Sequence, residues 1–117
     1  MNNRSFQVQE RYERFKKDNV HAQSSFFLDE RRMSIVANFE FWYVEENDFP
    51  YDNVFSTHHL IVPKRLIAFY RESNQAEHEE FLYVKKKLFG NYDGILENFP
   101  GSRSIVNHWH AHLFVWK

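Results

Sequence analysis

The chain has 117 residues, of which 43% are hydrophobic and 19% aromatic, with only three glycines and three prolines. This length and composition predict one domain over residues 1–117 with enough apolar material for a core, and they argue against disorder. The formal net charge is −1 and cysteine is absent. These features argue against a polybasic nucleic-acid surface, and they exclude disulfides, a cysteine-based zinc site and a thiol nucleophile.

The amino-terminal stretch MNNRSFQVQERYERFKKDN is charged, and no window approaches the roughly 20 apolar residues that a membrane span needs. We therefore expect no membrane association and a cytoplasmic location. Apolar residues recur near helical spacing at Phe6, Val8, Tyr12 and Phe15, with Ser5 or Asn3 as a cap. This pattern predicts a short amphipathic helix over residues 4–17.

Residues 26–44 have the composition of a β-hairpin. The first arm is predicted at Phe26–Leu28, the turn at residues 29–32 and the second arm at residues 34–44. Clustered Pro, Asp and Asn predict a loop over residues 47–54. Residues 56–65, STHHLIVPKR, predict a strand that ends at Pro63, because proline cannot donate in a ladder.

The second half begins with a capping box, Asn74 with Glu77, which predicts a helix over residues 75–89 with Gly90 as its C-terminal cap. Residues 93–99 predict a strand, residues 100–104 a loop, and residues 105–116 a terminal strand with alternating pattern. The order predicts an α+β fold: an antiparallel sheet of about five strands with helices packed on one face.

Three histidines occupy every second position of the terminal strand, at His108, His110 and His112. Side chains alternate across a strand, so these imidazoles are predicted to form a row on one face. A row of three imidazoles is costly to bury and fits two uses. One is a zinc site completed by another ligand; the other is a histidine nucleophile that attacks phosphorus, with its neighbours binding phosphate oxygens.

Three segments resemble motifs of the histidine-triad (HIT) superfamily of nucleotide hydrolases and transferases. They are HWHAHLF at residues 108–114, THHLIVPK at residues 57–64 and NDFP at residues 47–50. They occur in the order of the family, with the predicted helix between the second strand and the last. The resemblance covers residues 39–117 and implies a HIT-like fold.

The resemblance also implies roles for individual residues. His110 is implied as the nucleophile on the α-phosphorus, forming a nucleotidyl-histidine intermediate and oriented by a backbone carbonyl near His108. His108, His112 and His58 complete the catalytic set. Phosphate contacts are implied for Ser102, Arg103, Ser104 and Asn98, and nucleotide contacts for Asn47, Phe49 and Pro50.

The loop before the triad strand departs from the family. Members commonly have Gly-Gln-Ser or Gly-Gln-Thr there, whereas this chain has Ser102-Arg103-Ser104-Ile105. Ser104 thus replaces the glutamine, and Arg103 either binds phosphate in its place or is a solvated loop charge. We expect the chemistry of the leaving group to differ accordingly.

Other residues near the motifs are assigned by alternation. His59 should lie on the face opposite His58, and Trp109 and Trp116 should serve core packing or a subunit surface. Tyr51, Asp52 and Asn53 lengthen the family's loop and either shape the nucleotide pocket or extend a turn.

The expected partner is a nucleotide or dinucleotide substrate, without a cofactor or metal, and homodimers are known among the family. Two alternatives stay open: a zinc-dependent hydrolase using the same histidines, and a nucleotide-binding or RNA-end-processing module with weak catalysis. The even spread of basic residues counts against nucleic-acid ends as the substrate.

Overall fold

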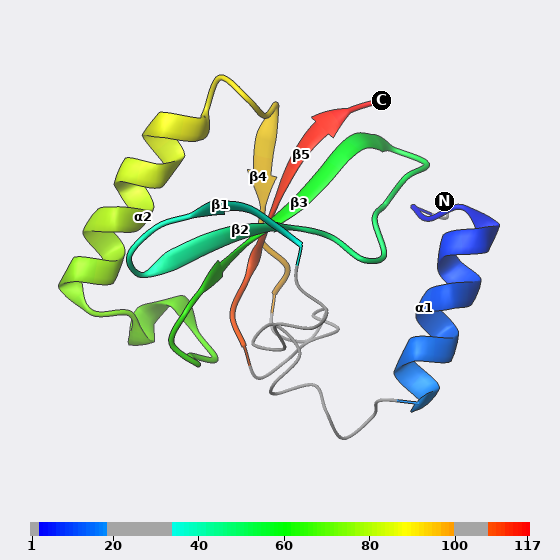
Figure 1. Cartoon of the computed structure of the whole chain (residues 1–117), viewed down its shortest axis with the longest axis horizontal. Coiled ribbons are helices and arrows are strands. Elements are labelled where there is room, and N and C mark those ends of the chain that lie inside the picture. The colour runs from blue at the N-terminus through cyan, green and yellow to red at the C-terminus, as the bar shows by residue number, and fades with distance from the viewer. Residues whose placement is uncertain (1–2, 19–33, 100–107) are drawn as a thin grey trace.

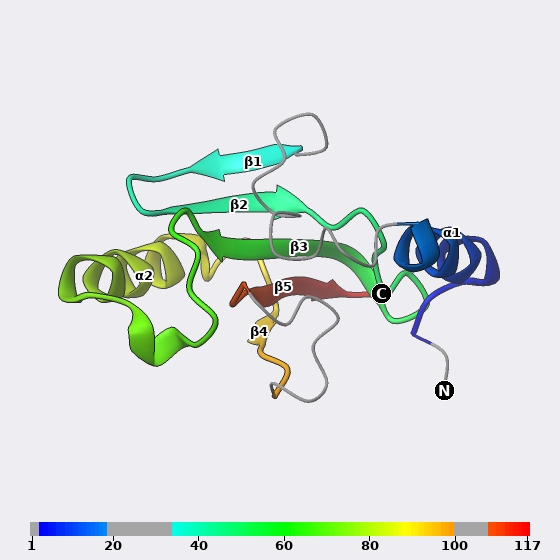
Figure 2. The same ribbon diagram turned by 90° about the horizontal axis from the view of Figure 1, so that it is seen from below.

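The computed structural model describes residues 3–18, 34–99 and 108–117. Its elements are α1 (Phe6–Asp18), β1 (Ile35–Asn38), β2 (Trp42–Glu46), β3 (Phe55–Pro63), the 3₁₀ turn η2 (Tyr70–Glu72), α2 (Gln75–Leu88), β4 (Gly94–Leu96) and β5 (Ala111–Trp116). The strands form one antiparallel sheet in the order β1-β2-β3-β5-β4. Figure 2 shows the strands side by side in this order. The predicted α+β class and five-stranded antiparallel sheet are confirmed.

The two faces of the sheet have different partners. Residues of β2, β3 and β5 pack against α2 in one apolar cluster that includes Trp42, Ile61, Val84 and Leu113. We call this side the helix face. The opposite side, the histidine face, carries His58, Leu60, His112 and Phe114, because Leu60 pairs with His112 and His58 with Phe114.

The two helices lie at opposite ends of the molecule (Figure 1). Helix α2 covers the helix face, whereas α1 packs through Tyr12 and Phe15 on Phe49, in the loop between β2 and β3, at 5.2 Å between ring centroids in both pairs. Ser5 caps α1 as predicted, since its Oγ accepts from the Val8 amide. Phe6, placed on the apolar stripe by the sequence, is exposed.

The capping box of α2 is also confirmed, because the Asn74 side chain accepts from the Glu77 amide and Glu77 accepts from the Asn74 amide. Gly90 does not form the expected left-handed cap: the C-cap is Phe89 in right-handed helical conformation, and no glycine of the described residues has a positive φ. The chain leaves α2 through a turn in which the Asn91 amide donates to the Leu88 carbonyl.

The hairpin prediction was wrong in its boundaries. Residues 34–44 are not one arm: β1 and β2 pair with each other around a turn at residues 39–41, while the predicted first arm, Phe26–Leu28, lies outside the described residues. The turn forms because the amides of Phe41 and Trp42 donate to the Glu80 carboxylate on α2. The alternation therefore breaks, and Phe39 and Phe41 pack on the same cluster as Trp42.

The terminal strand is shorter than predicted. It begins at Ala111, so His108, Trp109 and His110 precede it, and residues 105–107 lie outside the described residues. The ladder with β3 starts at the Ile61–Ala111 pair, because β3 ends at Pro63 as predicted. The Trp109 amide instead donates to the Ile67 carbonyl at 2.7 Å, which holds the start of the triad against the segment after β3.

Candidate active site

Four histidine side chains come from two neighbouring strands and the turn before one of them. His58 lies in the middle of β3, His112 lies in β5, and His108 and His110 directly precede β5. All four are buried, with exposed fractions of 0 to 6%. Burial of an imidazole is costly unless it is hydrogen-bonded, and each of the four rings has at least one nitrogen in a hydrogen bond.

His58 and His112 form a hydrogen-bonded pair across the diagonal of the β3–β5 ladder. Nε2 of His58 lies 2.7 Å from Nδ1 of His112. The backbone amide of Tyr51 donates to Nδ1 of His58 at 2.9 Å, so that nitrogen has no proton of its own. The proton of His58 therefore sits on Nε2 and is donated to His112, whose own proton sits on its Nε2.

Backbone carbonyls show which ring nitrogen of His110 and of His108 carries the proton. Nδ1 of His110 lies 3.0 Å from the carbonyl oxygen of His108, and a carbonyl only accepts, so Nδ1 carries the proton and Nε2 carries the lone pair. This is the carbonyl that the family resemblance implied. Nε2 of His108 likewise donates to the Pro63 carbonyl at 2.8 Å, which ties the triad to the end of β3.

The paired imidazoles are uncharged at neutral pH. Burial, aided by the charges of Arg4, His59 and His110, lowers the pKa of His58 to about 3. Burial is the main cause that lowers the pKa of His112 to about 2, and the charges of His110, His58 and Arg4 lower it further. Burial also lowers the pKa of His108, against hydrogen bonds to the backbone. Both rings must be neutral for this arrangement, in which each imidazole carries one proton and accepts one hydrogen bond.

Two predicted site residues lie beside the pair. Nδ2 of Asn98 lies 3.3 Å from Nε2 of His112. The two ends of an asparagine amide exchange places by a 180° flip, and the flipped amide puts its oxygen where it accepts the ring proton of His112. The Asn47 amide nitrogen lies 3.3 to 3.4 Å from the ring nitrogens of His58, and its oxygen accepts from the Phe49 amide. Asn47 therefore organises the loop as well as bordering the site.

The remaining predicted residues divide into two groups. Phe49 and Pro50 are half-buried, and the Phe49 ring contacts α1. Ser102, Arg103 and Ser104 lie outside the described residues. His59 lies on the helix face as expected, where its Nδ1 is 2.7 Å from the Tyr92 hydroxyl, and Trp109 is in the core as expected.

Sequence reasoning missed Arg4 and left the role of Tyr51 open. The Arg4 guanidinium carbon lies 4.6 Å from the centroid of the Tyr51 ring, and that ring lies 4.6 Å from the His58 ring and 5.7 Å from the His112 ring. No local pattern connects positions 4, 51 and 112. A fixed spacing signal is absent because the contact depends on how α1 packs.

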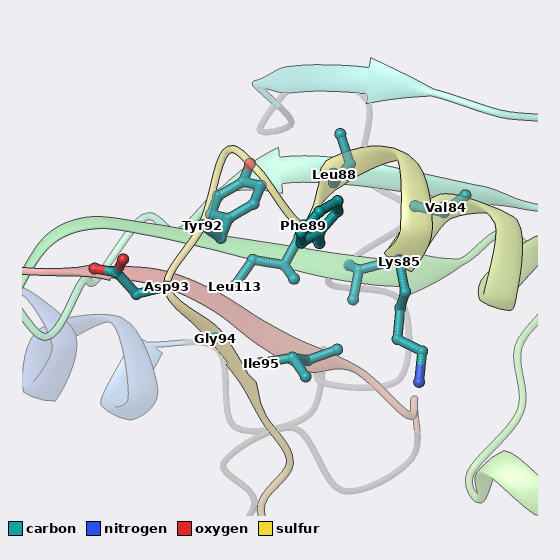
Figure 3. Close-up of a pocket in the computed structure, with 10 residues that line it drawn as sticks. Val84, Lys85, Leu88, Phe89, Tyr92, Asp93, Gly94, Ile95 and Leu113 are labelled. Carbon is teal, nitrogen blue, oxygen red and sulfur yellow. The ribbon is translucent and has the colours of Figure 1, made fainter.

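A pocket lies on the helix face, away from the four histidines. It is a pocket of about 280 Å³ between the C-terminal end of α2 and strands β4 and β5 (Figure 3). Leu88, Ile95 and Leu113 line its floor and walls, with Lys85 and Asp93 at its margins. Its lining is mainly apolar and it contains none of the four histidines.

The donor groups of the described residues do not form a metal site. Among residues 3–18, 34–99 and 108–117, no three histidine or acidic side chains are grouped to hold a metal ion. Nε2 of His58 and Nδ1 of His112 face each other at a distance that fits a hydrogen bond.

No helix within the described part of the chain is long and apolar enough to cross a membrane.

Comparison with known proteins identifies the fold. No family model matches the sequence, and no curated protein matches it. Among solved structures, a HIT family hydrolase from Legionella pneumophila Philadelphia 1 is 22% identical over 80% of this chain and 89% of its own, with a TM-score of 0.57. A HIT family hydrolase from Clostridium thermocellum is 20% identical over 79% of this chain and 86% of its own, with a TM-score of 0.59.

A third solved structure, a hypothetical histidine triad nucleotide-binding protein from Sulfolobus tokodaii strain 7, is 22% identical over 81% of this chain and 68% of its own, with a TM-score of 0.60. The chain therefore has the HIT-like fold that its motifs implied. At these identities the likeness concerns the fold, and the chemistry must be argued from the chain's own residues.

Proposed function

We propose that this protein is a HIT-like nucleotide hydrolase or nucleotidyl transferase that acts at the α-phosphate through a covalent nucleotidyl-His110 intermediate. The observation that carries the proposal is the hydrogen bond from Nδ1 of His110 to the His108 carbonyl. It places the lone pair on Nε2, and a neutral imidazole nitrogen held in this way is a competent nucleophile near pH 7.

In the first step, Nε2 of His110 bonds to the α-phosphorus while the bond from phosphorus to the leaving group breaks. The imidazole keeps its proton on Nδ1, so the intermediate carries positive charge on the ring, which the His108 carbonyl stabilises. A leaving group that departs as an anion needs a proton, which we assign to the segment of Ser102, Arg103 and Ser104. In the second step water or another acceptor attacks phosphorus, the bond between phosphorus and Nε2 breaks, and the proton of the attacking group returns to the donor that protonated the leaving group.

Charge on the nonbridging oxygens rises in both steps. Nε2–H of His112 is the donor that we assign to these oxygens, because its Nδ1 is occupied by His58. Asn98, adjacent to that nitrogen, is assigned to the same phosphate. His58 has both ring nitrogens engaged, one by the Tyr51 amide and one by His112, and so acts through His112.

The nucleoside half of the substrate is assigned to the loop after β2. Asn47 is proposed for the ribose hydroxyls, and Phe49 with Pro50 for one wall of the base pocket. The substrate class is a mononucleotide ester or phosphoramidate, or a dinucleoside polyphosphate, acted on in the cytoplasm. The homodimer implied by the family resemblance and the RNA-end alternative remain predictions for separate tests.

The experiment incubates the protein with α-³²P-labelled mononucleotide esters and dinucleoside polyphosphates, followed by a rapid quench. Wild type and His78→Ala, a control at an exposed histidine of α2, should trap label on the protein. His110→Ala should trap none and lose about a thousandfold or more in turnover. Equal trapping in wild type and His110→Ala would show that the nucleophile is another residue.

The zinc alternative has its own test on the same preparation. Metal analysis should find no stoichiometric zinc, and chelators should leave turnover unchanged. Stoichiometric zinc whose removal abolishes turnover would contradict the covalent mechanism. The hydrogen bond between Nε2 of His58 and Nδ1 of His112 supports the phosphate interpretation, since two nitrogens bonded to each other do not also bind one metal ion.

A further inference from the structure

The segment before α1 reaches the histidine site from outside the sheet. The guanidinium carbon of Arg4 lies 4.1 Å from the centroid of the Tyr12 ring and 4.6 Å from that of the Tyr51 ring. The Tyr51 ring in turn contacts the imidazoles of His58 and His112, and it is stacked on the latter with 26° between planes. A fixed positive charge is thus one aromatic ring away from the buried pair.

Hydrogen bonds from the same segment clamp the loop on both sides of Tyr51. Nε of Arg4 donates to the Phe49 carbonyl at 2.8 Å. The Ser5 amide donates to the Asp52 carboxylate at 2.7 Å, and the Asn53 side chain donates to the Arg4 carbonyl at 2.9 Å. The loop residues before and after Tyr51 are therefore fixed to the start of α1.

This clamp matters because the Tyr51 amide determines where the protons of the pair lie. It donates to Nδ1 of His58, which leaves Nε2 of His58 as the donor to His112. If the amide moved away, Nδ1 of His58 would be able to carry the proton. His112 would then donate to His58, and the hydrogen bond between the two rings would run in the opposite direction. The proton on Nε2 of His112 depends on one backbone group in this loop.

We propose that Arg4 and Tyr51 are positioning residues of the histidine site, which hold the His58–His112 pair in a single uncharged tautomer with the proton of His112 on Nε2. The Tyr51 amide sets the tautomer, and the Arg4 charge opposes protonation of the pair. The use of that proton on a phosphate rests on the proposed function. The proton positions themselves are a property of the protein without substrate.

Three segments of the described residues carry groups whose charge acts on the pair. Burial is the main cause that lowers the pKa of both rings, and Arg4 lowers the pKa of both as well. His59 of β3 acts on His58, and His110 before β5 acts on both rings. Among these groups, Arg4 is the permanent cation, since a guanidinium stays protonated at all accessible pH values.

Nitrogen-15 NMR of the imidazole rings tests the proposal directly on the protein without substrate. At pH 7 the spectrum should show Nε2–H tautomers for His58 and His112 and the Nδ1–H tautomer for His110. Single substitutions of the three histidines assign the signals. A Nδ1–H tautomer at His58, or a mixture of both forms, would overturn the assignment of Tyr51.

The role of Arg4 is tested with a graded series, Arg4→Lys, Arg4→Gln and Arg4→Glu. The pKa values of His58 and His112 should be lowest in wild type and Arg4→Lys, higher in Arg4→Gln and highest in Arg4→Glu. The step from Arg to Gln should be about one pH unit. The Lys variant retains the charge without the guanidinium hydrogen bond, so it separates charge from loop packing.

The matched control is Arg11→Gln, which removes the same charge from α1 at a residue that faces Phe49. It should leave the titration of the pair unchanged. The proposal is contradicted if the Arg4 series shows no order, or if Arg11→Gln has the same effect as Arg4→Gln. If the spectra behave as expected but no nucleotide is turned over, the positioning inference stands and the proposed function fails.

Discussion

Three of the four histidines of the site have one ring nitrogen assigned by a backbone group, and His112 is assigned through its hydrogen bond with His58. The His108 and Pro63 carbonyls accept hydrogen bonds from His110 and His108, and the Tyr51 amide donates to Nδ1 of His58. These backbone groups belong to the loop before β3, the last residue of β3 and the segment before β5. The residue types alone predicted a row of imidazoles, but not which nitrogen of each ring reacts.

The buried neutral histidines make stability dependent on pH. Because the pKa of His58 and His112 is far below the ordinary value of 6.5, the unfolded chain binds more protons than the folded chain below that pH. The contribution of the two neutral rings to the free energy of unfolding is complete above pH 6.5 and is lost as the pH falls toward 3. Each histidine should lower the free energy of unfolding by about 1.4 kcal/mol per pH unit within this window.

Urea unfolding between pH 7.5 and 5 measures this slope. The double variant His58→Gln with His112→Gln should have a smaller slope than wild type, whereas His78→Gln, at an exposed position, should keep it. A wild-type free energy of unfolding that does not change below pH 6.5 would contradict the neutral pair.

Gly94 is required by a close approach on the histidine face. A Cβ at this position would lie 2.7 Å from Cζ of Phe114, its partner residue in the β4–β5 ladder. Gly94→Ala should therefore lower the free energy of unfolding by about 2 kcal/mol. Denaturant unfolding measures the loss, and adding Phe114→Leu should recover part of it.

Gly90 supplies the control for this substitution. Its Cβ would meet no described atom within 4 Å, and its φ is not positive, so Gly90→Ala should be neutral or slightly stabilising. Equal destabilisation by both substitutions would mean that the Phe114 contact is not the cause.

At the scale of elements, the sequence predicted those whose determinants are local. The capping box defined α2, Pro63 ended β3, and the Pro, Asp and Asn cluster defined the loop between β2 and β3. The run from residue 34 to 44 contains no glycine or proline, so nothing local marks its turn. That turn depends on Glu80, which lies 39 residues beyond Phe41.

Glu80→Ala tests this dependence. The amides of Phe41 and Trp42 would lose their carboxylate acceptor, at 2.7 and 3.1 Å, in a partly buried position. We expect a loss of about 2 kcal/mol in thermal or denaturant unfolding. Glu79→Ala removes the same charge from the exposed side of α2 and should have little effect. Equal loss of stability in both variants would show that the Glu80 carboxylate does not hold this turn.

At the scale of the whole molecule, the two helices have different tasks. Helix α2 buries the helix face of the sheet, while α1 holds the loop that shapes the histidine site (Figure 1). The four histidines were predicted as site residues because motifs carry them, and Asn98 because the family resemblance implies an asparagine near that position; the structure brings Asn98 beside His112. Arg4 was missed because its contact with Tyr51 arises from packing between segments 47 residues apart.

The docking of α1 depends on Phe49. Its ring contacts Tyr12 and Phe15, so Phe49→Ala should release α1 and raise amide exchange rates across Phe6–Asp18 by about tenfold or more. Exchange in β3 and β5 should change little. Phe89→Ala, at an exposed aromatic after α2, is the control and should leave α1 protected. Unchanged exchange in α1 after Phe49→Ala would contradict this view of the fold.

The identity of the nucleophile is tested most directly by mass spectrometry of the quenched reaction. After rapid mixing with a nucleotide ester and an acid-free quench, peptide mapping should find a nucleoside monophosphate on the peptide that contains His110. Fragmentation should place it on His110, and the adduct should be absent in His110→Ala. An adduct on another residue, or turnover at the wild-type rate by His110→Ala, would contradict the proposed mechanism.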